Sequence, residues 1–142
     1  MAEPHTIQVE VVSAEGEIFS GPATMVFAPA SQGDIGVAPR HAPLLSMLKP
    51  GEVRVETPAG EELFFFVGGG AIEVQPHRVT VLADTALRAK DLDEAAALAA
   101  KQRAEEALKD RSSHISQAEA LAELARAAAQ LKLIAKLRKV RG

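Results

Sequence analysis

Residues 78–100 read RVTVLADTALRAKDLDEAAALAA, and the character of the chain changes within this stretch. Its first residues alternate as a half-buried strand does, whereas its end is rich in alanine, the strongest helix former. Upstream lie all eight prolines, all five phenylalanines and every glycine except the terminal Gly142. The stretch therefore predicts a β unit over residues 1–86 followed by a helical unit over residues 87–142.

Short strand patterns follow one another closely in the first unit. They cover residues 6–13, 51–56, 62–67, 71–74 and 78–82. Turn chemistry in Thr57-Pro58-Ala59-Gly60 joins the second pattern to the third as a hairpin, and Gly68-Gly69-Gly70 is expected to bend the chain between the third and the fourth. Strands this short and this closely spaced predict a small antiparallel sandwich or barrel.

The second unit has helical periodicity. Asp91 followed by Glu94 predicts the N-cap of a first helix over residues 91–109, and Ser116 followed by Glu119 predicts the start of a second over residues 116–139. An i, i+3, i+7 stripe is expected to bury the second helix, through Leu121, Leu124, Ala128, Leu131 and Ala135. The short polar link predicts an antiparallel two-helix hairpin in which facing alanines let the backbones approach closely.

Such a hairpin is expected to dock weakly. Alanine buries little area, and burial contributes roughly 25 cal/mol per Å². Residues 110–114, the link, contain no glycine or proline that would forbid helix. Residues 91–140 could therefore also form one rod of about 75 Å, at about 1.5 Å per residue. The sequence permits a switch between the two forms.

Composition excludes several classes of protein. The chain has 142 residues, 47% hydrophobic and 25% charged, with a net charge of -3, which is typical of a folded soluble protein and gives no sign of nucleic-acid binding. It has no cysteine, which excludes disulfides and thiolate metal sites. The densest bulky apolar run, Leu63 to Val67, is far shorter than the about 20 residues of a membrane span, and no secretory signal opens the chain.

No catalytic or metal-binding pattern is present. The four histidines lack metal-ligand spacing and are interpreted as surface residues: they are His5, His41, His77 and His114. The triple glycine at 68–70 lacks a following Lys-Ser or Lys-Thr and precedes a strand, so it is interpreted as a tight turn or bulge and not as a phosphate loop. We therefore predict a protein without a cofactor that is not itself an enzyme.

Charge is distributed unevenly. Residues 1–90 hold 6 basic against 11 acidic residues, whereas residues 91–142 hold 10 against 8. Lys132, Lys136 and Lys139 can share one helix face, which is either a solvated helix end or a docking strip for an acidic partner. Residues 33–43 are interpreted as structural turns that could equally present Asp34 and His41 to a partner.

The order of short motifs along nearly the whole chain resembles the ε subunit of bacterial F-type ATP synthase. The segments that carry the resemblance are VVSAE (11–15), FSG (19–21), GDIG (33–36), HAPLL (41–45), KPG (49–51), GGG (68–70), EVQP (73–76), VTVLAD (79–84), DLDEA (91–95) and AELARA (122–127). The resemblance implies an N-terminal antiparallel β-sandwich followed by a C-terminal antiparallel two-helix hairpin.

The same resemblance implies a non-catalytic rotor subunit on the cytoplasmic side of a bacterial plasma membrane, where it meets the membrane only through the complex. In that family the sandwich sits on the γ subunit and the c-ring. The helices can extend along γ into the α/β catalytic head and suppress ATP hydrolysis. Two alternatives remain open: an ε subunit whose hairpin never extends, and a small β-sandwich ligand-binding protein with an unrelated helical tail.

The resemblance also carries over to single residues. Asp34 and His41 match rotor-facing positions, while the basic residues that would meet an acidic segment of the β subunit are Arg126, Lys132, Lys136 and Lys139.

A nucleotide site found in some members is degenerate here. Asp93, Arg103 and Arg126 match it, but Ala96 and Gln130 stand where arginines are expected. A triphosphate needs cationic donors, so we expect weak or no ATP binding.

Overall fold

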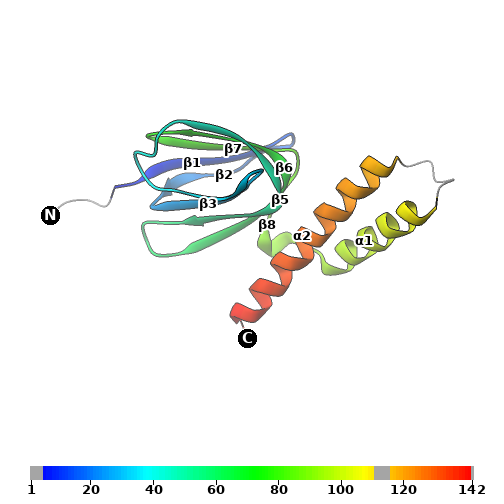
Figure 1. Cartoon of the computed structure of the whole chain (residues 1–142). Coiled ribbons are helices and arrows are strands. Elements are labelled where there is room, and N and C mark those ends of the chain that lie inside the picture. Colours follow the sequence, from blue (N-terminus) through cyan, green and yellow to red (C-terminus); the bar gives the residue numbers. More distant parts are fainter. Residues whose placement is uncertain (1–4, 111–115, 142) are drawn as a thin grey trace. The chain divides into compact units, whose positions relative to one another are not determined.

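The computed structural model describes residues 5–110 and 116–141. Its contacts divide the chain into two compact units, Met1–Arg88 and Ala89–Gly142. The first, here the β unit, consists of strands, and the second, here the helical unit, consists of helices (Figure 1). Each is described by itself below.

The strands of the β unit form one continuous sheet in the order β2-β1-β7-β6-β5-β3-β4, with β8 paired to β6. They are β1 (Ile7–Ser13), β2 (Gly16–Ala23), β3 (Met25–Ala30), β4 (Gly33–Val37), β5 (Leu44–Glu56), β6 (Glu62–Gln75), β7 (Arg78–Ala83) and β8 (Ala86–Arg88). Neighbours pair antiparallel except β1 and β7, which are parallel. Five strands, β2 to β6, lie between β1 and β7 along the chain. The parallel pairing of β1 with β7 departs from the predicted antiparallel arrangement.

The triple glycine does not separate two strands, so that interpretation was wrong. β6 runs unbroken from Glu62 to Gln75 because Gly69 and Gly70 take positive φ angles of 112° and 131°, which glycine adopts at little cost. At this point β6 changes its neighbour: β8 pairs with residues 65–67, and β7 with residues 70–75. The strand therefore serves two parts of the sheet.

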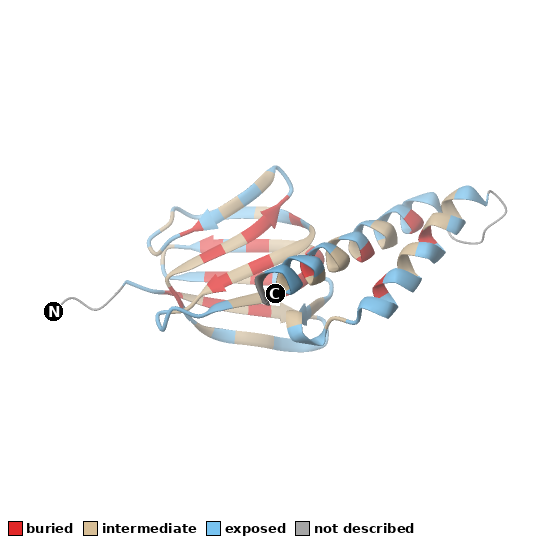
Figure 2. Cartoon of the chain, turned by 90° about the horizontal axis from the view of Figure 1, so that it is seen from below, coloured by how far each residue is buried: buried red, intermediate tan, exposed pale blue. Residues whose placement is uncertain are grey.

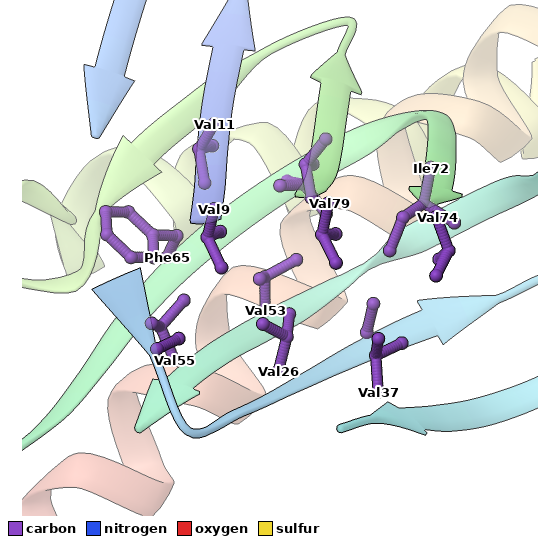
Figure 3. Close-up of a cluster of buried hydrophobic side chains, with 14 of the residues drawn as sticks. Val9, Val11, Val26, Val37, Val53, Val55, Phe65, Ile72, Val74 and Val79 are labelled. Atoms are coloured by element: carbon purple, nitrogen blue, oxygen red, sulfur yellow. The ribbon is translucent and has the colours of Figure 1, made fainter. Parts of the chain in front are cut away.

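The sheet closes over a single core, which confirms the predicted β-sandwich. Val9 of β1 and Val26 of β3 are fully buried in the same cluster, although their strands are not paired (Figure 3). Buried positions alternate along β1 and β7 as the pleat requires (Figure 2). Most of the buried side chains in this core cluster are valines, which suit a half-buried pleated surface.

Residues 33–43 are only partly a loop. Gly33–Val37 forms β4, the edge strand beside β3, so the interpretation of this whole stretch as turns was wrong. Ile35 packs against the core and Val37 is buried in it, so alternate residues of β4 face the core on either side of Gly36. β2, β3 and β4 were not predicted from the sequence.

Two helices follow a short 3-10 turn, η1 (Ala89–Asp91): α1 (Glu94–Lys109) and α2 (Gln117–Arg141). The predicted cap at Asp91 was wrong, because η1 takes up Asp91 and Asp93 is the N-cap of α1. The carboxylate of Asp93 accepts a hydrogen bond from the N–H of Ala96 at 3.2 Å. The predicted cap at Ser116 is confirmed, since its Oγ accepts from the N–H of Glu119 at 3.1 Å.

The two helices form the predicted antiparallel hairpin. Arg138 near the end of α2 pairs with Glu94 at the start of α1, and Arg103 pairs with Glu123 at 3.5 Å. Small residues face each other as expected, and the buried alanines are Ala97, Ala104, Ala120 and Ala127.

The predicted apolar stripe of α2 was wrong by one residue at several positions. Leu121 is 55% exposed, and Ala128 and Ala135 are exposed, whereas Leu124 and Leu131 are half-buried. The buried positions Ala120 and Ala127 have the same seven-residue spacing as Ala97 and Ala104 of α1. Alanines in register allow a closer approach of the two backbones than a larger Leu121 would.

Candidate functional site

Asp34 lies on β4, opposite Pro29 of β3. Its side chain is exposed, and its carboxylate has no partner among the residues that the structure describes. Alternate residues of β4, Ile35 and Val37, face the core, so Asp34 points away from it. Asp34 is therefore available to a cation or a donor outside the chain.

His41 lies in the loop that joins β4 to β5. Its backbone N–H donates to the carbonyl oxygen of Ala38 at 3.2 Å, and its Nδ1 lies 2.6 Å from the carbonyl oxygen of Ala42. The next residue back, Arg40, donates its backbone N–H to the carbonyl oxygen of Pro76 at 2.9 Å. The loop is tied at several points. Within the described chain no hydrogen bond or ion pair joins His41 to Asp34, so the two are separate contact points.

An exposed apolar patch, missed by the sequence analysis, covers one outer face of the β unit. Leu45 and Met47 on β5 are 73% and 62% exposed, and Leu82 on β7 is 52% exposed. Met47 pairs with Ala71 of β6, which in turn pairs with Leu82, so these side chains form one row across three strands. We call Leu45, Met47, Ala71 and Leu82 the apolar patch. Contiguous exposed apolar surface of this kind marks an interaction site.

A signal for this patch was present in the sequence. Alternation from Leu48 places Ser46 on the same side of the strand and places Leu45 and Met47 on the other side. The structure shows that Leu48 is buried, so Leu45 and Met47 are on the outer side. A strand that is apolar on its outer side as well is unusual for the solvated face of an antiparallel sheet. Residues 44–48 were not predicted as a strand from the sequence, so the alternation of Leu45 and Met47 did not lead to a predicted patch.

We call Lys132, Lys136 and Lys139 of α2 the basic strip, and all three are exposed. At about 100° per residue, Lys136 and Lys139 lie within about 60° of Lys132. Arg126 lies about 80° to 140° away from them by the same geometry, and it is half-buried. The hairpin therefore brings together Lys132, Lys136 and Lys139 but leaves Arg126 on another side of the helix.

The residues that match a nucleotide site are engaged within the hairpin. The carboxylate of Asp93 caps α1, and the guanidinium of Arg103 lies 3.5 Å from the carboxylate of Glu123. Arg126 follows Glu123 by three residues, so it lies about 4.5 Å further along α2 than the partner of Arg103. Asp93 and Arg103 are ten positions apart on one helix, which separates them by about 15 Å.

Comparison with known proteins identifies both units. Residues 6–89 match the family model described as ATP synthase, Delta/Epsilon chain, beta-sandwich domain, and residues 90–135 match its long alpha-helix domain. The chain belongs to the ATP synthase delta/epsilon family. The resemblance in the sequence is thereby confirmed, and the alternative of a ligand-binding sandwich with an unrelated tail is set aside.

Relatives within the delta/epsilon family cover almost the whole chain. The ATP synthase epsilon chain of Nitrosococcus oceani is 64% identical over 137 residues, which are 96% of this chain and 98% of that one. The ATP synthase epsilon chain of Halorhodospira halophila is 58% identical over 94% of this chain and 96% of that one. Like them, the chain is a non-catalytic subunit of ATP synthase.

Solved structures show the same fold. A chain in the mitochondrial ATP synthase of Euglena gracilis, in a structure of its OSCP/F1/c-ring, matches with a TM-score of 0.72 and 17% identity over 100% of this chain and 85% of that one. A chain in the central stalk/c-ring structure of the Tetrahymena thermophila mitochondrial ATP synthase matches with a TM-score of 0.58 and 14% identity, over 96% of this chain and 98% of that one. The delta/epsilon fold is therefore shared at low identity.

The described part of this delta/epsilon chain contains no group of three or more His, Cys, Asp or Glu side chains placed to hold a metal ion. One of the four histidines, His114, lies outside the described residues. None of the helices in the described ranges is long and apolar enough to cross a membrane.

Proposed function

We propose that this ATP synthase subunit works in the central stalk, where it couples the γ subunit to the c-ring and restrains ATP hydrolysis through its C-terminal helices. The observation that supports this most directly is the match of both units, in order, to the two domains of one family. The epsilon chains of Nitrosococcus oceani and Halorhodospira halophila, which it resembles over almost its whole length, are bacterial. The proposal therefore includes the cytoplasmic face of a bacterial plasma membrane and proton translocation.

The apolar patch is the proposed seat for the γ subunit. Burial of one exposed Leu or Met side chain contributes about 1.5–3 kcal/mol. Leu45, Met47 and Leu82 are all more than half exposed, so a partner that covers them gains several such contributions. A gain of this size in binding free energy suits the buried centre of a stable protein interface, which is apolar and surrounded by a polar rim.

Asp34 and His41 are the proposed contacts with the c-ring. Asp34 offers a carboxylate that has no partner within the described chain, and His41 sits in a loop whose backbone is already tied. A fixed loop loses little entropy on binding. We expect the double variant Asp34→Ala, His41→Ala to fold normally and to weaken the coupling of hydrolysis to proton pumping in the reconstituted complex.

The helical unit is proposed to switch between the hairpin and an extended form. Among the described residues of the hairpin, the buried side chains are four alanines and Leu133, and the two cross-helix ion pairs have largely exposed arginines; exposed pairs contribute about 0–1 kcal/mol each. An extended form would gain contacts between Lys132, Lys136, Lys139 and an acidic partner. A partner can shift such an equilibrium when the two forms differ by about a few kcal/mol, which is the difference proposed here.

ATP is not proposed as a ligand of the hairpin. Ala96 supplies a capping N–H to Asp93 but no cation, and Arg103 already pairs with Glu123. Binding a triphosphate would have to break that pair and to proceed without two of the expected cations.

The experiment for the central-stalk role is reconstitution with purified γ and c-ring. We expect the full chain to bind the γ–c-ring complex and to co-purify with it. Variant Met47→Asp should lose this binding, whereas Ala14→Asp, which adds the same charge on an exposed turn, should keep it. Equal binding by the two variants would refute the apolar patch as the seat, and no binding by the unaltered chain would refute the central-stalk role.

A further inference from the structure

Arg40 is the one non-glycine residue with a positive φ in the part of the chain that the structure describes, at 68°. This left-handed conformation places Cβ too close to the backbone, and glycine adopts it freely while asparagine tolerates it. An arginine here is unfavourable for the fold. Strained backbone positions of this kind gather where a protein binds something.

The loop holds Arg40 in this conformation. The N–H of Arg40 donates to Pro76 of the β6–β7 turn at 2.9 Å, and the N–H of His41 donates back to Ala38 at 3.2 Å. Pro39 and Pro43 restrict the backbone on either side. The base of the Arg40 side chain is therefore fixed relative to the β unit.

The side chain of Arg40 does not contribute to the fold in return. It is exposed, and its guanidinium has no hydrogen bond or ion pair with any described residue. Other arginines of the β unit differ: Arg54 lies 4.1 Å from the ring centroid of Phe27 and near Glu62, and Arg78 lies 3.9 Å from Glu10. Arg40 combines a strained backbone with a guanidinium that has no partner among the described residues. This combination indicates that Arg40 binds a group outside the chain.

We propose that Arg40 binds a carboxylate on the protein surface of the c-ring, next to the contact made by His41. This inference rests on the proposed function. The planar guanidinium matches a carboxylate with two parallel hydrogen bonds, and a fixed backbone lowers the entropy lost in forming them. Arg40 then adds a positive contact to an interface that also includes the negative contact of Asp34, which gives it a defined charge pattern.

Anionic lipid is the competing partner, and the charges argue against it. Membrane surfaces recruit clusters of basic residues, whereas residues 1–90 hold 11 acidic against 6 basic residues. A lone arginine on a surface that is negative overall suits one carboxylate in a defined geometry better than a diffuse layer of headgroups.

The test compares Arg40→Asn, Arg40→Lys and a matched control. Asparagine tolerates the left-handed backbone but removes the charge, and lysine keeps both charge and strain. Lys90→Asn removes one charge from the exposed Lys90 of η1 and serves as the control. Two quantities are measured: the urea midpoint of the free chain, and its affinity for the γ–c-ring complex in nanodiscs of zwitterionic lipid.

We expect Arg40→Asn to unfold at the same or a higher urea concentration than the unaltered chain while binding about tenfold more weakly or worse. Arg40→Lys should lose less affinity than Arg40→Asn, and Lys90→Asn should bind as the unaltered chain does. Arg40→Asn binding as tightly as the unaltered chain would overturn the proposal. So would Arg40-dependent binding to anionic vesicles that contain no protein. If the unaltered chain did not bind the complex at all, the proposed function would fall as well.

Discussion

Gly70→Ala is expected to cost the β unit much of its stability. A Cβ at Gly70 would lie 2.1 Å from the carbonyl oxygen of Leu82 and 2.9 Å from Cα of Ala83. Both are backbone atoms of β7, and Gly70 pairs with Ala83 in the β6–β7 ladder. β7 cannot move away from the added Cβ without separating from β6.

The magnitude follows from three contributions. A side chain at φ 131° costs about 1–3 kcal/mol in backbone strain. Relieving the overlap by moving β7 adds about 1–3 kcal/mol or more of overpacking, and weakening ladder hydrogen bonds adds about 0.5–1.5 kcal/mol each. The total is about 3–7 kcal/mol, which is comparable with the whole stability of a small domain, about 5–15 kcal/mol.

Gly16→Ala is the matched control. Gly16 has φ 130°, within a degree of Gly70, but a Cβ there meets nothing within 4 Å. It should therefore show the strain alone. Urea unfolding of the free chain, followed by far-ultraviolet circular dichroism, measures both variants. We expect Gly70→Ala to be the less stable by at least about 2 kcal/mol. Equal losses in the two variants would refute the close approach of β6 and β7 at this point.

Three further predictions concern the helical unit and the apolar patch. Arg138→Glu should open the hairpin by repulsion from Glu94, with the open population rising about two- to fivefold by spin-label distances, and adding Glu94→Arg should restore closure; failure of the double swap to restore it would contradict the pairing. Met47→Asp should weaken binding to purified γ at least about tenfold without changing the urea midpoint, because Met47 is 62% exposed; a lowered midpoint would show that Met47 supports the fold. Calorimetry should detect no ATP binding to the free chain, and Ala96→Arg should raise the affinity if the site is degenerate for lack of cations; tight binding by the unaltered chain would contradict this.

Periodicity predicted the elements whose pattern is local. The alternation of Val9 and Val11 in β1 and the Ser116–Glu119 cap of α2 depend on a few neighbouring residues, so the sequence alone was sufficient for them. The family resemblance favoured the sandwich over the barrel and agreed with the hairpin that the short polar link had already predicted.

Features that depend on distant residues were not predictable in this way. β6 continues through Gly69 and Gly70, where β5 pairs with it on both sides of the glycines, and this pairing lies outside the local pattern. The choice of Ala120 over Leu121 as the buried position depends on the alanines of α1, which no pattern within α2 reveals.

The candidate site follows the same division. Asp34 and His41 were predicted from one loop and the three lysines from their helical spacing, and the structure leaves the lysines together on one exposed face. The apolar patch needed the register of β5, β6 and β7, and the strained backbone of Arg40 needed coordinates. The pairing of Arg138 with Glu94 joins positions 44 residues apart.

The restraint of hydrolysis by the helical unit is tested most directly by the ATPase rate of the catalytic head assembled with γ. Three forms of the chain are compared: the full chain, the chain ended at Arg88 between the two units, and the full chain with Lys132, Lys136 and Lys139 replaced by alanine. Alanine preserves the helix while it removes the cations. We predict that the shortened chain and the alanine variant both give faster hydrolysis than the full chain. Equal rates for all three forms would contradict a restraining role for the C-terminal helices.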